Sequence, residues 1–140
     1  MDYSFAEINN PQSQSRHGTQ VIVQSIEKQM VVQPQDFVSV LTGESLKLEC
    51  WVEGGLPSGP MKWFLGNGTD RKVIYEDALA PGRVTRNQKS SLTDFTIVIH
   101  NVTDKDAGTY YCGMEKRLKR NGGPDWKIGS GTQVAVKSEW

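Results

Sequence analysis

The sequence has little of what would point to a metal site, a membrane span or a nucleic-acid partner. Only two of the 140 residues are cysteine, which is too few for a zinc ion held by four thiolates. The longest apolar runs fall far short of the roughly 20 residues that cross a bilayer as a helix. The 16 basic and 16 acidic side chains cancel, so no net charge draws the chain toward a polyanion. We therefore expect a globular domain with no cofactor, no nucleic-acid partner and no membrane span in this chain.

The first 26 residues differ in composition from the rest. They are rich in Gln, Ser and Asn and contain few large apolar side chains before Val21, as is typical of chain that does not pack into a core. They also lack the basic start, apolar stretch and small-residue cleavage site of a secretory signal. We expect residues 1–26 to be a flexible leader or a non-native extension, with any export signal missing or already removed. Residues 27–140 are expected to form one domain.

Short alternating runs separated by Gly, Pro, Asn and Asp begin at Met30. No segment keeps a helical period, so the pattern predicts an all-β sandwich of antiparallel strands. In the run 45–52 the alternation predicts inward Leu46, Leu48, Cys50 and Val52, with outward Lys47, Glu49 and a partly exposed Trp51. In the run 94–102 it predicts inward Phe95, Ile97 and Ile99, with outward Thr96, Val98 and His100.

Further strands are predicted on both sides of a turn. Residues 61–64 and 72–75 form two of them, and Asn67-Gly68 is expected to make a two-residue hairpin turn because both residue types tolerate positive φ. Residues 132–137 close the series, with Val134 and Val136 in alternation. The resulting set of short segments suits two packed sheets.

Cys50 and Cys112 stand about 60 residues apart and either form a disulfide or remain two free thiols. A bridge over such a loop would contribute about 4 kcal/mol in the loop-entropy picture, and it would favour an oxidising compartment. Trp63 follows Cys50 by thirteen residues, so it can pack on a bridge there. Tyr110 lies two residues before Cys112, the position of a tyrosine corner, whose hydroxyl bonds back to the backbone.

With Trp63, the run Asp106-Ala107-Gly108-Thr109-Tyr110-Tyr111-Cys112 resembles the immunoglobulin variable family. The resemblance covers residues 29–137. It implies a variable-type β-sandwich with one inter-sheet disulfide, Cys50–Cys112, and room for the two extra strands that distinguish variable from constant domains. It also implies an ion pair between Asp106 and Arg83, and a glycine bulge at Gly129-Ser130-Gly131 before the last strand.

Two departures separate the chain from antigen-receptor variable domains, which carry a pairing glutamine soon after the core tryptophan and open their last strand with Phe-Gly-x-Gly. Here Phe64-Leu65-Gly66 follows Trp63, and Ile128 precedes Gly129. A closer resemblance is to the membrane-distal domain of the signal-regulatory proteins, paired receptors of myeloid cells. The segments that carry it are Val32-Gln33-Pro34, Gly43-Glu44-Ser45, residues 56–64, Val73-Ile74-Tyr75 and Gly123-Pro124-Asp125.

The resemblance to signal-regulatory proteins implies an extracellular domain of a plasma-membrane receptor that binds a protein on another cell through its loops. The best-known member binds the integrin-associated protein, which restrains phagocytosis, and the parent receptor would regulate myeloid cell signalling. Carried over by position, the candidate ligand-binding residues are Gly55, Leu56, Gly59, Pro60, Lys62, Pro124 and Asp125. Residues 76–77 and 89–92 match the family only loosely.

The segment 115–121 is longer and more basic than the family pattern. Four of five consecutive positions are cations: Lys116, Arg117, Lys119 and Arg120. These residues would steer an acidic ligand surface and raise the association rate, or they are merely solvated at a hairpin tip. The difference leaves three alternatives open: a paired immune receptor with another protein ligand, an antigen-receptor-like variable domain, and a homophilic adhesion module.

Two sequons, Asn67-Gly68-Thr69 and Asn101-Val102-Thr103, predict N-glycosylation. Asn67 also suits a plain turn residue. No nucleophile, base and orienting residue come together in a recognisable pattern. We therefore expect binding rather than catalysis.

Overall fold

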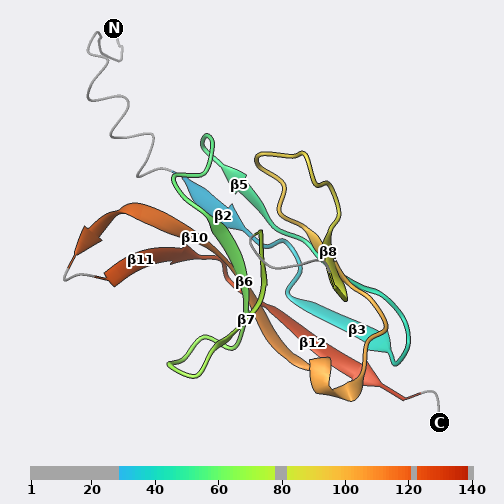
Figure 1. The fold of residues 1–140 in the computed structure, drawn as a ribbon. Coiled ribbons are helices and arrows are strands. Elements are labelled where there is room, and N and C mark those ends of the chain that lie inside the picture. Colours follow the sequence, from blue (N-terminus) through green and yellow to red (C-terminus); the bar gives the residue numbers. More distant parts are fainter. Residues whose placement is uncertain (1–28, 78–81, 121–122, 139–140) are drawn as a thin grey trace, which may run out of the picture.

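A computed structural model of the chain describes residues 29–77, 82–120 and 123–138. These residues form two layers of strands packed face to face (Figure 1), and the predicted all-β variable-type sandwich is confirmed. The expected leader, residues 1–26, lies outside the described residues. In chain order the elements are β2 (Met30–Val32), β3 (Phe37–Leu41), β4 (Leu46–Leu48), β5 (Trp51–Glu53), β6 (Met61–Leu65), β7 (Lys72–Glu76), β8 (Val84–Arg86), β9 (Ile97–Ile99), the 3-10 turn η1 (Asp104–Asp106), β10 (Gly108–Arg120), β11 (Gly123–Ile128) and β12 (Thr132–Lys137).

The larger layer is a sheet in the order β3-β12-β10-β6-β7, with β11 paired to β10. Its neighbouring strands run antiparallel except β3 and β12, which run parallel. β10 and β11 form a long hairpin that projects beyond the other strands (Figure 1). Of the two extra strands that the family resemblance implies, β7 is present, and residues 78–81, where the second would begin, lie outside the described residues.

The second layer consists of β4-β9-β8 and, beside it, β2-β5. The predicted faces of the run 45–52 are correct, with Leu46, Leu48, Cys50 and Val52 buried and the residues between them more exposed. The run is nevertheless split into β4 and β5. At the break, two backbone amides donate to side chains instead of to a neighbouring strand. The Glu49 amide donates to Gln35 Oε1 (2.8 Å) and the Cys50 amide to Thr96 Oγ1 (3.3 Å).

The outward prediction for Thr96 is wrong. Its residue is 3% exposed, and its hydroxyl accepts the Cys50 amide at the break between β4 and β5. Alternation along one strand cannot reveal this acceptor role, because it arises from a strand break 46 residues away. His100 is exposed as predicted, and Val98 is half-buried.

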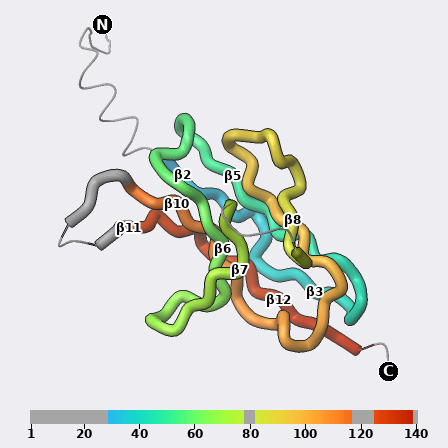
Figure 2. The backbone as a smooth tube through the Cα atoms, in the orientation of Figure 1, coloured from blue at the N-terminus to red at the C-terminus, as the bar shows by residue number. Residues whose placement is uncertain are grey.

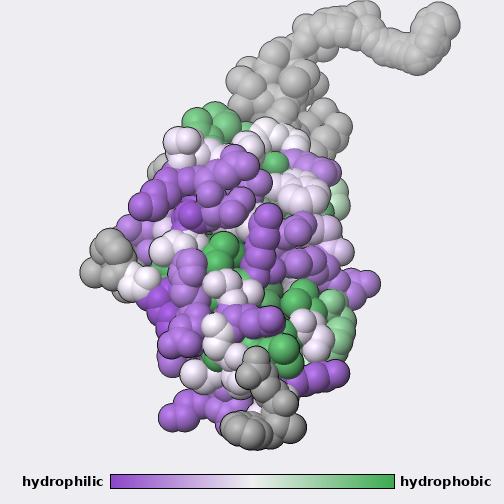
Figure 3. Space-filling view, turned by 90° about the vertical axis from the view of Figure 1, so that its right-hand side faces the viewer, coloured by the Kyte–Doolittle hydropathy of each residue, from purple (hydrophilic) through white to green (hydrophobic). Residues whose placement is uncertain are grey.

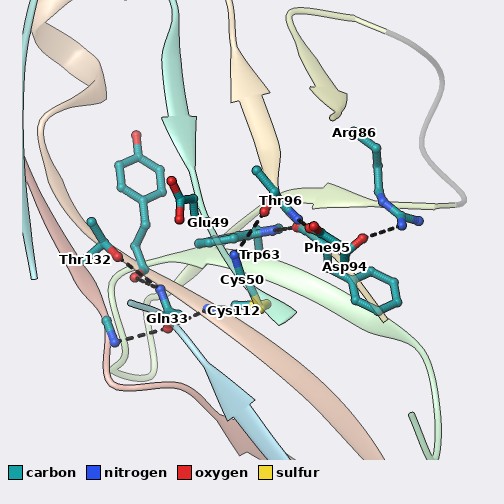
Figure 4. Close-up of a disulfide and its surroundings, with 12 residues drawn as sticks. Gln33, Glu49, Cys50, Trp63, Arg86, Asp94, Phe95, Thr96, Cys112 and Thr132 are labelled. Atoms are coloured by element: carbon teal, nitrogen blue, oxygen red, sulfur yellow. Dashed lines mark hydrogen bonds between the residues drawn. A yellow bond between two sulfur atoms is a disulfide. The ribbon is translucent and has the colours of Figure 1, made fainter. Parts of the chain in front are cut away.

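The Cys50–Cys112 disulfide is confirmed and joins the two layers, with both residues fully buried. Trp63 is 1% exposed and its indole Nε1 donates to the carbonyl of Phe95 (2.8 Å). Figure 4 shows this indole beside the disulfide in the middle of the sandwich. A buried indole N–H needs such an acceptor, so the bond fixes the ring against the layer opposite its own strand.

The predicted two-residue turn at Asn67-Gly68 is wrong. β6 ends at Leu65 and β7 begins at Lys72, so the connection spans residues 66–71. Positive φ falls on Gly66 (85°) rather than on Asn67, and the Arg71 amide donates to the Gly68 carbonyl (3.2 Å). A glycine one position earlier supplies the left-handed conformation, which allows a wider loop.

Gln33 is a buried polar residue between β2 and β3, and its side chain bonds to β10 and to the start of β12. Its side-chain carbonyl accepts the amides of Cys112 (3.1 Å) and Gly131 (3.0 Å). Its amide nitrogen donates to the Tyr110 carbonyl (3.1 Å) and to Thr132 Oγ1 (3.4 Å). All four hydrogen-bonding positions of the amide are therefore used. Gln33 ties β10 to the start of β12 (Figure 4).

Two positions before β12 need glycine because side chains from elsewhere in the chain lie against their backbone. Gly131 has φ of 95°, and a Cβ there would lie 2.6 Å from the Tyr111 ring. A Cβ at Gly129 would lie 2.4 Å from Gln33 Oε1. A side chain at position 129 would collide with Gln33 and one at position 131 with Tyr111, which explains the two glycines of the Gly129-Ser130-Gly131 sequence.

Candidate protein-binding surface

Two loops and a hairpin lie in the same half of the domain. They are residues 54–60 between β5 and β6 (loop 54–60), residues 87–93 after β8 (loop 87–93), and the β10–β11 hairpin (Figure 1). β12 ends at the opposite end of the sandwich (Figure 2). A domain continued through β12 would therefore present these segments away from the remainder of its chain.

Loop 54–60 is fastened to β10 at the base of the hairpin. The Glu115 amide donates to the Pro60 carbonyl (2.9 Å), and the Ser58 hydroxyl donates to the Glu115 carbonyl (3.3 Å). A Cβ on Gly59 would lie 2.5 Å from that same carbonyl. The loop and the hairpin thus meet as one surface, and only glycine at position 59 permits this approach.

The tip of loop 54–60 presents an apolar side chain on a held backbone. Leu56 is 60% exposed, and its carbonyl accepts a hydrogen bond from the Gln29 side-chain amide. Gly55 beside it has φ of 130°, which strongly favours glycine. The backbone on both sides of Leu56 is therefore held in place, and its side chain extends into solvent.

Lys62 lies in the middle of the sheet rather than in loop 54–60 or in the hairpin. It lies in β6 on the outer face of the larger layer, where its ammonium pairs with Glu76 (3.3 Å) and sits 5.3 Å from the ring centroid of Trp126. Both side chains of the ion pair are largely covered. Lys62 is thus held on the sheet, beside the loop surface rather than within it.

The outer face around Lys62 is closed by side chains of the same chain. Phe64 is 3% exposed. The edge of Trp126 packs against it (5.4 Å between centroids, 87° between planes), and the Arg71 guanidinium lies 4.5 Å from its centroid. Aromatic and cationic contacts of this kind cover the apolar ring without a second domain.

The hairpin carries the remaining candidates. Lys116 is exposed and pairs across the ladder with Asp125, which is also exposed. The pairing shifts register between Lys116 and Arg120. Side chains at the other candidate positions, Arg117, Lys119, Arg120 and Pro124, lie outside the described part of the chain.

The lower end of the core is closed by Arg83, Asp106 and Tyr110. Two guanidinium nitrogens of Arg83 donate to the two carboxylate oxygens of Asp106, each at 2.9 Å. The Tyr110 hydroxyl donates to the Asp106 carbonyl (2.6 Å), which is a tyrosine corner. The Arg83 hydrogen bonds hold the pKa of Asp106 below its ordinary value, with a further contribution from the Thr103 amide. Burial, together with the Asp106 charge, raises the pKa of Tyr110 to about 12.

We expect Asp106→Asn to make the free energy of unfolding depend less on pH in the acid range. Because the pKa of Asp106 is lower in the folded than in the unfolded state, where it is near 3.8, the ion pair stabilises the fold above that pH. This stabilisation is lost as the pH falls through the folded value. At pH 7 the variant should be less stable by about 1 to 2 kcal/mol, a modest figure because Arg83 is half-exposed. Urea unfolding at pH 7 and below pH 3 should show the gap closing in acid. A gap independent of pH would contradict the assignment.

Residues 32–137 match the family model of the immunoglobulin V-set domain. The chain belongs to the immunoglobulin V-set family. The V-set domain is of the signal-regulatory-protein type. It is 42% identical over 113 residues to tyrosine-protein phosphatase non-receptor type substrate 1 of Bos taurus and 40% identical over 116 residues to signal-regulatory protein beta-1 of Homo sapiens. Each match covers 78% of this chain but only 22% and 28% of those relatives, so the chain spans less than a third of their length.

The fold of the V-set domain is also similar to a chain in a solved structure described as "Structural basis of T cell specificity and activation by the bacterial superantigen toxic shock syndrome toxin-1". The TM-score is 0.60 at 22% identity, over 78% of this chain and 99% of that chain. At this identity the likeness concerns the fold alone. The relatives point to an extracellular or cell-surface location, and within the described ranges no helix is long and apolar enough to cross a membrane.

Both sequon asparagines are exposed in the V-set domain. Asn67 Nδ2 lies 3.3 Å from the Tyr111 hydroxyl. Asn101 has φ of 56°, and Thr103 of its sequon caps η1 by accepting the Lys105 amide. Exposure of both residues is compatible with glycan attachment, which stays a prediction for both.

Two residues of the V-set domain were missed by sequence reasoning. Gln33 was noticed only as part of a family segment, and Arg86 at the end of β8 was not noticed at all. A charged residue within an otherwise unremarkable three-residue strand, Val84-Thr85-Arg86, carries no local signal of burial. Its side chain is nevertheless 7% exposed, because in the folded chain it donates to the carbonyls of Gln88, Ser91 and Asp94 and packs on the Phe95 ring.

Proposed function

We propose that this chain is the ligand-binding domain of an immune cell-surface receptor. Through loop 54–60 and the β10–β11 hairpin it would bind the integrin-associated protein on an opposing cell, and so regulate myeloid signalling and phagocytosis. The observation that carries the proposal is the junction of loop 54–60 with the hairpin at Glu115, in the half of the domain remote from the end of β12. Such a junction presents two loops as one fixed surface, which reduces the entropy lost on binding.

The charge of the hairpin supports a protein ligand with an acidic surface. The chain as a whole has a formal net charge of zero, whereas residues 116–120 contribute four cations in sequence. A local positive cluster on a neutral protein steers an oppositely charged partner and raises the association rate more than the affinity.

Among the alternatives, an antigen-receptor-like domain is least supported. Domains of that kind pair through the outer face of the larger layer, and here Phe64 on that face is covered by Trp126 and Arg71 of the same chain. A paired immune receptor with a different protein ligand uses the same loop surface, so only binding experiments separate it from the proposal.

Surface plasmon resonance with the same-species integrin-associated protein ectodomain tests the proposal. We expect saturable binding, with an association rate about tenfold lower when Lys116, Arg117, Lys119 and Arg120 are replaced by serine, and a steeper salt dependence for the native sequence. The matched control replaces four exposed lysines outside the hairpin: Lys47, Lys72, Lys105 and Lys137.

Absence of binding by the folded, disulfide-bonded domain would refute this ligand and favour a receptor with another partner. Equal association rates for the two fourfold variants would be consistent with this ligand. They would contradict the idea that the cations of the hairpin steer it.

A further inference from the structure

A pocket of about 290 Å³ lies at the end of the sandwich that carries η1. Its lining comes from β6 and β7 of one layer, from β8 and β9 of the other, and from η1 and the start of β10. Loop 54–60 and loop 87–93 lie at the other end of the domain (Figure 1). The pocket is therefore separate from the surface proposed to bind a protein.

The floor of the pocket is apolar. Ile99 is 1% exposed, and Leu65, Ile74 and Val84 are half-buried. These three pack against the core and also line the pocket. An apolar group that entered the pocket would cover side chains that water now contacts, which favours binding. A volume of about 290 Å³ is near the lower limit of ligand sites, so the pocket suits a small ligand.

The rim of the pocket is cationic. Lys72 at the start of β7 and Lys105 in η1 are exposed, and neither forms an ion pair among the described residues. The charge of Lys72 contributes to the lowered pKa of Asp106, so its field acts on the groups of the pocket. With Arg83 the lining holds three cations and one carboxylate, that of Asp106. The excess of positive charge favours an anion.

Arg83 has donors left for such an anion. Its Nη1 donates to Asp106 and to the His100 carbonyl (3.3 Å), and its Nη2 donates to the other oxygen of Asp106. A guanidinium has five N–H groups, so two of them make no hydrogen bond within the described part of the chain. The side chain is 46% exposed, which leaves it accessible to a ligand. Guanidinium N–H groups form strong hydrogen bonds with carboxylate oxygens.

We propose that this pocket binds a small aliphatic carboxylate, whose chain packs on the apolar floor and whose carboxylate meets Lys72, Lys105 and Arg83. A simple inorganic anion would leave the floor in water, and a neutral lipid would leave the cations unpaired. The side of the domain that carries β8 is mainly hydrophilic, with apolar residues in separate patches (Figure 3). A short chain with a charged end suits such a surface better than a broad apolar ligand does.

Octanoate is the probe for this site. Octanamide is its neutral counterpart, and acetate carries the same charge without the chain. Backbone amide shifts of the isotope-labelled domain should move saturably with octanoate at Leu65, Ile74 and Val84. We expect a dissociation constant on the order of 1 mM, typical of a ligand with about ten heavy atoms. Octanamide and acetate should each bind at least about fivefold more weakly, since each lacks one of the two interactions.

The double variant Lys72→Ser/Lys105→Ser should bind octanoate about fivefold more weakly and octanamide as the native domain does. Its matched control is Lys47→Ser/Lys137→Ser, which removes two exposed lysines that do not line the pocket. Val84→Phe should fill the pocket and weaken binding of both octanoate and octanamide. If Val84→Phe does not fold, the lysine variants still decide, because both of their side chains are exposed.

Three results would overturn the proposed site. One is the absence of saturable shifts around the pocket. Another is equal affinity of the native domain for octanoate and octanamide, and the third is an equal loss of octanoate affinity in the two lysine pairs. The probe is independent of the protein ligand, so failure of this site does not affect the proposed function, and failure of the proposed function does not affect this site.

Discussion

Replacing Cys50 and Cys112 with alanine is expected to lower the free energy of unfolding by at least about 4 kcal/mol, the largest effect expected for any substitution in this domain. The bridge closes a loop with a sequence separation of 62, and in the chain-entropy account it removes that much conformational freedom from the unfolded state. Single domains are typically stable by 5 to 15 kcal/mol, so the variant should be marginal or unfolded at 37 °C. Urea unfolding followed by tryptophan fluorescence provides the measurement.

The native protein unfolded with and without a thiol reductant is the control for this experiment. Reduction breaks the cross-link and keeps both sulfur atoms, whereas the alanine variant also loses their packing at fully buried positions. We expect the reduced protein to lie between the native and variant proteins. A variant within about 1 kcal/mol of the native protein would contradict a dominant role of the cross-link.

Gln33→Ala is expected to destabilise the domain by about 3 kcal/mol. The change leaves the buried amides of Cys112 and Gly131 without the acceptor that Gln33 provides, and an unmet buried donor destabilises by about 1 to 3 kcal/mol. It also opens a cavity between β10 and the start of β12. The change in urea midpoint should show the loss, and hydrogen exchange at Gly131 should become much faster than in the native protein.

Gln35→Ala is the matched control for Gln33→Ala. Gln35 also bonds backbone groups of another strand, accepting the Glu49 amide (2.8 Å) and donating to the Lys47 carbonyl (3.2 Å). It is only partly buried, so water can replace its bonds and the expected loss is about 1 kcal/mol. Equal losses of stability for the two variants would contradict the idea that burial makes the hydrogen bonds of Gln33 the stronger contribution.

Strand faces were predictable from sequence wherever burial alone decided them. Leu46 and Leu48 alternate with the polar residues Ser45, Lys47 and Glu49, and each leucine is at most 1% exposed. Thr96 was mispredicted because a hydroxyl can satisfy a distant amide and be buried for that reason. The Asn67-Gly68 turn was mispredicted because nearby Gly66 offered the same positive φ with a wider loop.

The candidate surface was predictable only as a set of loop positions. Gly59 and Pro60 were named from a family resemblance, and the structure shows their contact with Glu115. Lys62 was named with them, yet it lies on the sheet and is engaged by Glu76 and Trp126. Sequence position alone does not say which way a residue at the start of a strand faces until the strand register is fixed.

The sequence by itself determined the class of fold and its fixed points: the alternating strands, the Cys50–Cys112 pair, Trp63 and the tyrosine corner at Tyr110. The strands follow from local periodicity and the expected places of Trp63 and Tyr110 from spacings along the chain, whereas the pairing of Cys50 with Cys112 was implied by the family resemblance. Only the tertiary structure decided the roles of Gln33 and Arg86. Gln33 meets groups 77 to 99 residues away, and the burial of Arg86 depends on how Phe95 and the loop fold over it. A polar side chain is buried only when distant groups arrive to satisfy it, and no local pattern records their arrival.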